Sequence, residues 1–233
     1  LAQLYFELGE YPLRLNLITR TLDQSESKAI EARALNILAS VQSILNDVKT
    51  ATDTFARAYT ASLASGDQAM TLTVLTNHLR HELDNKNANK SLAIGKQLLT
   101  LSSTLGVRSD TVEIQISIGD LFIRIADQNG EDNFYRQALS ILQQAETTAK
   151  NQGQVRLQSY AIGHQGRLLI NQNKLEDGIQ RLTTANSLAN TRRAFESAYL
   201  WQWQLARALR LQGKTDDAIS GYQTAIGTLE HVR

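Results

Sequence analysis

Small residues recur along this chain at a spacing of about 40 residues, and this repeat constrains the fold more than any other feature of the sequence. The first register consists of Ala51, Ser91, Ala138, Gly178 and Ala218, and one of its intervals is stretched to about 47 residues. Two more registers keep the same spacing: Phe55, Gly95, Leu142, Leu182 and Tyr222, then Ala58, Leu98, Ala145, Ala185 and Ala225. A period of this size is typical of a stacked array of repeats.

Each repeat has the pattern of two helices joined by a short turn. Within a repeat the registers are three and four residues apart, which places their side chains on one helix face. The chain has one proline and 13 glycines, so few positions would interrupt helices. Asp67 and Asp110 are candidate N-caps. The expected turns fall at Gly9-Glu10, Asn46-Asp47, Asn85-Lys86-Asn87, Asn173-Lys174 and Gly213-Lys214.

These signals divide the chain into about six helix hairpins. We place them at residues 1–24, 27–65, 67–105, 109–152, 154–191 and 194–231. In the first helix of the second hairpin we expect Ala34, Leu35, Leu38, Val41 and Leu45 to face inward. The residues that stretch one interval, around 126–133, predict either a longer loop or extended helix turns.

The last repeat resembles a tetratricopeptide repeat (TPR). Its motif positions hold Leu205, Ala206, Leu209, Gly213, Ala218, Tyr222 and Ala225. The aromatic first position of the motif falls on Gln202, between two tryptophans, and the usual proline after the second helix is absent. The resemblance implies an all-α fold over residues 1–233, a single right-handed superhelical solenoid of TPR-like hairpins.

The stretch from Tyr199 to Arg233 also resembles the closing repeat of bacterial TPR proteins that continue into a CHAT domain, which has a caspase-like protease fold. In that family the repeats precede the catalytic domain. The resemblance carries no catalytic residue to this chain, because the family's His–Cys pair would lie after Arg233.

Composition and motifs argue against several other functions. The formal net charge is +1 and the basic residues alternate with acids, so we expect no nucleic-acid partner. There is no cysteine, no Gly-x-Ser-x-Gly elbow, no phosphate-binding glycine loop and no His-Glu-x2-His motif. We therefore expect no enzyme, no cofactor, no metal and no membrane span. The chain begins at Leu1 without a visible signal peptide and reads as though truncated, and a cytoplasmic location is favoured.

The first helix of each hairpin lines the concave face of such an array, and its repeat positions predict a binding surface. The predicted peptide-binding residues are Asn36, Ser40, Thr76, Arg80, Asp120, Tyr160, Arg167, Trp203, Arg207 and Arg210. One interpretation is that the arginines bind carboxylates of an acidic protein segment or chain terminus, since the guanidinium fork holds a carboxylate bidentately. The alternative is that Asp120 and Glu113 pair with these arginines between neighbouring repeats, and that the polar row is simply solvated.

Histidines and tryptophans give further expectations. His78 and His81 form a His-x2-His pair, which we expect to be a surface pair without metal, while His164 is expected to pack in a tight helix crossing. Trp201 and Trp203 lie on opposite sides of one helix, so only one of them should be buried.

The last predicted helix keeps an apolar stripe of Ile219, Tyr222, Ile226 and Leu229, where an end repeat normally has a polar outer face. We expect this stripe to contact a missing domain or a second copy. The sequence as a whole predicts a non-catalytic scaffold that binds a protein or peptide. The alternative is a regulatory or structural arm for an attached effector domain, such as a CHAT protease.

Overall fold

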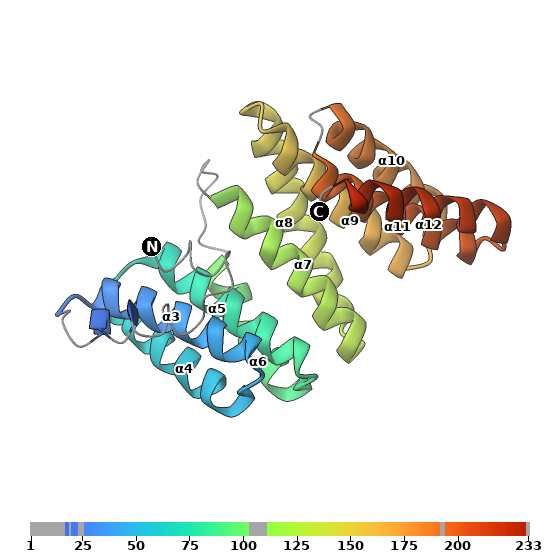
Figure 1. Cartoon of the computed structure of the whole chain (residues 1–233). Helices are drawn as coiled ribbons and strands as arrows, with labels where there is room; N and C mark the ends of the chain where they lie inside the picture. The colour runs from blue at the N-terminus through green and yellow to red at the C-terminus, as the bar shows by residue number, and fades with distance from the viewer. Residues whose placement is uncertain (1–16, 19, 23–25, 103–110, 192–193, 232–233) are drawn as a thin grey trace. The chain divides into compact units, whose positions relative to one another are not determined.

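The computed structural model describes residues 17, 18, 20–22, 26–102, 111–191 and 194–231. These residues form α-helices joined by short turns, with no strand among them, which confirms the predicted all-α class (Figure 1). The chain divides into two compact units, Leu1–Thr104 and Leu105–Arg233. The prediction of one continuous solenoid domain stays a prediction, and most of the expected hairpin 1–24 lies outside the described residues.

Unit 1 contains four described long helices: α3 (Lys28–Ile44), α4 (Val48–Ser65), α5 (Gln68–Asp84) and α6 (Ala88–Ser102). Each packs against the next along the chain, and α3 also packs against α5. The first helices of two successive repeats, α3 and α5, therefore lie side by side, as Figure 1 shows in blue and cyan.

Unit 2 contains α7 (Val112–Asn129), α8 (Asp132–Asn151), α9 (Val155–Asn171), α10 (Leu175–Thr191), α11 (Phe195–Leu211) and α12 (Thr215–Glu230). Successive helices again pack together, and the first helices form the contacts α7–α9 and α9–α11. The repeat of small residues explains this packing, because Ala138, Ala185 and Ala218 are buried where neighbouring helices approach.

The turns follow the predicted chemistry. Asn46, Lys86, Asn173 and Gly213 all have positive φ, the left-handed conformation that lets a helix end and the chain reverse. The Asp67 carboxylate accepts a hydrogen bond of 3.0 Å from the backbone N–H of Met70, which confirms it as an N-cap. Asp110 lies outside the described residues.

The predicted inward face of α3 is packed except at its C-terminal end. Ala34, Leu35 and Val41 are buried and Leu38 is half-buried, but the prediction for Leu45 was wrong. Leu45 is 52% exposed because α3 ends at Ile44, and Leu45 lies in the turn that follows.

The stretched interval forms extended helix turns. α7 continues further beyond Asp120 than α5, α9 and α11 continue beyond the equivalent residues Arg80, Arg167 and Arg207. α8 begins earlier, relative to its first small residue Ala138, than α4, α10 and α12 do relative to theirs.

Candidate functional site

A groove of about 400 Å³ lies between α3 and α5 in unit 1. Three of the predicted binding residues line it, namely Asn36, Ser40 and Arg80, together with Asn77. Thr76 is buried, and its hydroxyl donates to the carbonyl of Leu72 within its own helix. The 40-residue spacing therefore brings predicted residues from two repeats to one groove.

Side-chain amides and a guanidinium form a connected row along this groove. The Asn77 Nδ2 donates to Asn36 Oδ1 at 3.2 Å, and an Arg80 Nη donates to Asn77 Oδ1 at 2.9 Å. These two bonds use the amide oxygens as acceptors, so the remaining N–H groups of Asn36 and Arg80 are left as donors. Asp84 also lines the groove, so the lining has one negative side chain beside these donors.

His81 lines the groove, and its side chain is buried. Its Nε2 lies 3.2 Å from the carbonyl of Val48, an obligatory acceptor, so Nε2 carries the proton. Nδ1 is then the acceptor for the Ser43 hydroxyl at 2.7 Å. A serine bonded to a histidine also occurs in hydrolases. However, Ser43 lies in the last turn of α3, where the backbone N–H groups already donate within the helix, so that turn offers no backbone donors for an oxyanion.

The prediction of a surface His-x2-His pair was wrong, because both rings are buried beside Phe55. The ring centroids of His78 and Phe55 are 5.3 Å apart and nearly parallel, and the His81 ring is 5.6 Å from Phe55. The hydrophobic repeat explains the burial, since Phe55 occupies the second register and α5 packs on α4. Burial lowers the pKa of His78, while the neighbouring Glu82 carboxylate, 3.3 Å from its Nε2, partly opposes that shift.

In unit 2 the corresponding arginine is bound within the protein. The Arg167 guanidinium of α9 lies 2.7 Å from the Asp120 carboxylate of α7, and the His164 Nδ1 lies 3.3 Å from the same oxygen. Burial alone would raise the pKa of Asp120, but His164 and Arg167 outweigh it and lower that pKa well below its usual value. Asp120 pairs with Arg167 as the alternative interpretation expected, and that pair leaves fewer guanidinium donors for a ligand.

A second connection between first helices joins the predicted Arg207 to Asn171 and Asp127, which were not among the predicted binding residues. Asn171 of α9 donates to both carboxylate oxygens of Asp127 at 3.0 and 2.9 Å, and Arg207 of α11 donates to Asn171 Oδ1 at 2.8 Å. Tyr135 also donates to Asp127. Asp127 lies in the extra turns of the stretched interval, so the insertion supplies the acceptor that joins these helices.

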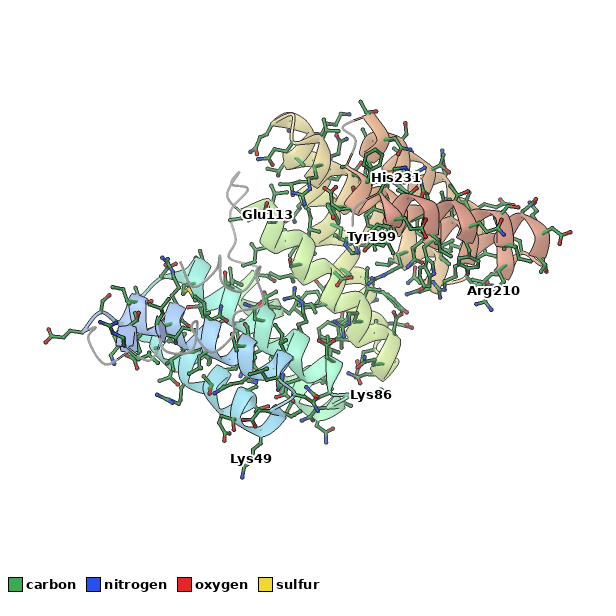
Figure 2. The ribbon with its side chains drawn as sticks, viewed as in Figure 1. Lys49, Lys86, Glu113, Tyr199, Arg210 and His231 are labelled. Atoms are coloured by element: carbon green, nitrogen blue, oxygen red, sulfur yellow. The ribbon has the colours of Figure 1, made fainter. Side chains whose placement is uncertain are left out.

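The remaining predicted residues lie on α9 and α11. Arg210 is exposed at the C-terminal end of α11 (Figure 2). Trp203 is 48% exposed, whereas Trp201 is 2% exposed, which confirms that one tryptophan of the pair is buried. The Tyr160 ring packs edge-on against Trp201, with the centroids 5.8 Å apart. Tyr160 therefore packs with the buried tryptophan, whereas the sequence analysis placed it with Trp203 on the binding face.

Asn77 and Asn171 are the polar residues that the sequence analysis missed. Asn77 belongs to the register Ile37, Asn77, Ser117, His164 and Gln204, which is polar in four repeats and gives a signal that could have been read. No comparable signal exists for Asn171, because its partner Asp127 belongs to the insertion and has no counterpart in the other repeats.

Searches against protein-family models and against curated proteins give no match. Solved structures do match. A TPR-like repeat protein of Podosopora anserina, described as a kinesin light chain, has a TM-score of 0.68 at 12% identity, over 90% of this chain and 99% of that one. BtubC (BKLC) from P. vanneervenii has a TM-score of 0.68 at 11% identity, over 98% and 92%.

A Rap protein solved in complex with Competence and Sporulation Factor matches with a TM-score of 0.52 at 11% identity, over 99% of this chain and 73% of that one. At these identities the similarity establishes the fold. The chain is therefore an all-α protein of the TPR-like helical repeat class, as its sequence predicts.

Proposed function

We propose that this chain is a non-catalytic scaffold that binds a protein or peptide segment along the first helices of its hairpins. The observation that carries the proposal is the α3–α5 groove, in which Asn36, Asn77 and Arg80 form one connected row with unused donors. Clustered donors at a groove need an acceptor from outside the chain, and a peptide supplies one carbonyl at every residue.

The ligand chemistry in this proposal rests on Arg80, which lines the groove together with the oppositely charged Asp84. Arg80 is exposed and can turn its fork toward a carboxylate, so an acidic segment or a free chain terminus suits the site best. Arg167 and Arg207 contribute less in this proposal, because Asp120 and Asn171 already accept from them. The fold supports the function class, since one protein of similar fold was solved in complex with a named factor.

An array of synthetic peptides with acidic, neutral and basic compositions tests this proposal. We expect acidic peptides to bind, with an affinity that falls as salt rises. Arg80→Ala and Asn77→Ala should each reduce that affinity about tenfold. Arg57→Ala is the matched control, because Arg57 is an exposed arginine on α4 and does not line the groove.

If no peptide binds, or if Arg57→Ala weakens binding as much as Arg80→Ala does, the groove is not the binding site. Nucleic acid serves as a competitor in the same assay. Displacement of the peptide by short nucleic acids would contradict the expectation that the partner is a protein.

A second candidate is a regulatory or structural arm for an attached effector domain, such as one of the CHAT type. The observation that favours it is the apolar exposure on α12, where Ile219 and Ile226 are 51% and 58% exposed. An arm should show no peptide affinity by itself and should change the activity of the effector when the two are joined. Among the described residues no helix is long and apolar enough to cross a membrane, and the cytoplasmic location stays part of this proposal.

A further inference from the structure

Trp201 connects α11 to the preceding repeat by filling a socket. Its indole Nε1 donates to Ser159 Oγ at 3.0 Å, and its ring packs edge-on against Tyr160 and His164 of α9. A Cβ atom on Gly163 would lie 2.4 Å from the indole, so only glycine allows this approach. On the other side Trp201 shares an apolar cluster with Ala185 of α10.

The positions that form this socket recur one repeat later, and there they surround a cavity. The residues around Trp201 are at positions 159, 160, 163, 164, 185 and 189. The residues 40 positions later are Tyr199, Leu200, Trp203, Gln204, Ala225 and Leu229. All six line a single cavity of about 330 Å³ formed by α9, α11 and α12. The positions around Trp201 therefore surround a cavity one repeat later, and no side chain from the described residues fills it. The two sites differ in shape, because Trp203 and Tyr199 replace Gly163 and Ser159.

The cavity is lined mainly by apolar and aromatic side chains, with His164, Arg167 and Gln204 also in its wall. Trp203 and Ile226 are about half exposed, and the Trp203 ring packs against Tyr222 with the centroids 6.3 Å apart. Ala225 is buried at the wall and is small enough to let a helix backbone come close, as Ala185 does beneath α11. Apolar side chains grouped around a concave site are typical of an interaction surface.

We propose that the α11–α12 face binds an amphipathic helix of a partner protein, which inserts one bulky apolar side chain into this cavity. The helix lies on the face of α11 and α12 that corresponds, one repeat later, to the face of α9 and α10 on which α11 packs. It lies further from α11 than α11 lies from α9, because Trp203 stands where Gly163 allows the close approach. This surface is separate from the α3–α5 groove and adds a second type of ligand to the proposed function. When a helix binds in a groove, a few buried bulky side chains of this kind supply most of the binding free energy.

A second copy of the chain is a poorer occupant. The residues equivalent to Trp201 in the other described first helices are Ala34, Val74, Ile114 and Ala161. Ala34, Val74 and Ala161 are buried within their own units, Ile114 is half-buried, and Trp201 itself is buried. In the described part of the chain no first helix is therefore free to offer such an anchor.

The probe for the test is a synthetic peptide with the sequence of α11, Phe195–Leu211, stapled on its polar face and labelled with fluorescein. Its anchor is the residue that fills the equivalent socket in this protein. We expect saturable binding to the chain by fluorescence anisotropy, and a peptide with alanine in place of Trp201 should bind on the order of tenfold more weakly or worse.

Two variants of the chain locate the site. Ala225→Phe fills the cavity, and Ile226→Asp places a charge at its exposed edge without disturbing the core, so one variant remains informative if the other folds poorly. Both should reduce binding of the α11 peptide by about tenfold. Thr224→Phe is the matched control on the exposed side of α12, and Arg80→Ala should leave this binding unchanged.

A spectroscopic measurement completes the test. The chain has two tryptophans, so a ¹⁵N-labelled sample gives two indole N–H signals. Binding should shift the Trp203 signal more than the Trp201 signal. Absence of binding, or binding that Ala225→Phe and Ile226→Asp leave intact, overturns the proposal. A self-association that Ile226→Asp abolishes in sedimentation also overturns it, because a second copy would then be the occupant.

Discussion

The first helices of unit 1 and unit 2 use the same repeat positions in different ways. In unit 1, Arg80 and Asn77 form a row along a groove and keep donors free for a ligand. In unit 2, the equivalent Arg167 is bound to Asp120, and Arg207 is bound to Asn171. An arginine at one position of a helical repeat can thus line a groove in one place and connect two helices in another, depending on whether the neighbouring repeat supplies an acceptor.

The largest loss of stability among the variants that separate the two units should come from Trp201→Ala in unit 2. Trp201 is buried and joins α9, α10 and α11, so its loss removes a large packed side chain and leaves a cavity. We expect a decrease of about 3–5 kcal/mol in the free energy of unfolding of unit 2. Urea titration followed by circular dichroism measures it.

Trp203→Ala is the control, since Trp203 is half exposed and should cost under about 1 kcal/mol. The assignment of the two tryptophans would be contradicted by equal losses in both variants. Binding of acidic peptides to the unit 1 groove should be unchanged in Trp201→Ala at temperatures where unit 2 remains folded. This result would separate helix packing in unit 2 from peptide binding in unit 1.

Asp120→Asn should have the next largest effect. It keeps the shape of the side chain but leaves the Arg167 guanidinium, which is 19% exposed, without its counter-charge. Because both side chains retain some contact with water, we expect a loss of about 1–3 kcal/mol. Asp53→Asn, a change at an exposed aspartate on α4, is the control and should cost under about 0.5 kcal/mol.

The pH dependence of the same variant gives an independent check. The pKa of Asp120 is lower in the folded chain than its ordinary value of 3.8. Its ion pairs therefore stabilise the fold fully above that value, and the stabilisation is lost as pH falls below it. Asp120→Asn should remove this part of the acid sensitivity; a variant as acid-sensitive as the parent chain would show that other carboxylates dominate.

The sequence was sufficient to predict the class of fold. The small-residue registers, the turn residues such as Asn46 and Gly213, and the N-cap Asp67 follow from local geometry that the repeat copies along the chain. Three of the predicted first-helix residues, Asn36, Ser40 and Arg80, line the α3–α5 groove, and their part in binding stays a prediction.

What the sequence did not predict depends on contacts between repeats. Whether Arg167 is free or paired is decided by the distance between α7 and α9, and periodicity does not contain that distance. His78 and His81 were expected at the surface because their side chains are polar, yet Phe55 and the hydroxyls of Ser43 and Thr52 supply a buried environment. These partners come from other helices, so helix periodicity alone could not reveal them.

A smaller effect is expected from pH in unit 1. Burial lowers the pKa of His78 below its ordinary value of 6.5, so the folded chain holds fewer protons than the unfolded chain as pH falls through that value. The stability of unit 1 should therefore decrease below about pH 6.5. His78→Asn should flatten this dependence, as measured by hydrogen exchange of α4 and α5. The exposed His231 is the control, and His231→Asn should leave the dependence of these helices unchanged.

The smallest effect on stability, and the one that distinguishes the two units most clearly, is expected for Arg80→Ala. Arg80 is exposed and donates to one amide, so its removal should change the free energy of unfolding by less than about 0.5 kcal/mol. Arg167→Ala should cost more, because it leaves the Asp120 carboxylate without its guanidinium partner. Binding of acidic peptides should show the reverse order, with the larger loss for Arg80→Ala. Measuring stability and peptide affinity for both variants tests this directly, and if Arg167→Ala weakens the peptide more than Arg80→Ala does, the arginines of unit 2 open their pairs to bind the ligand.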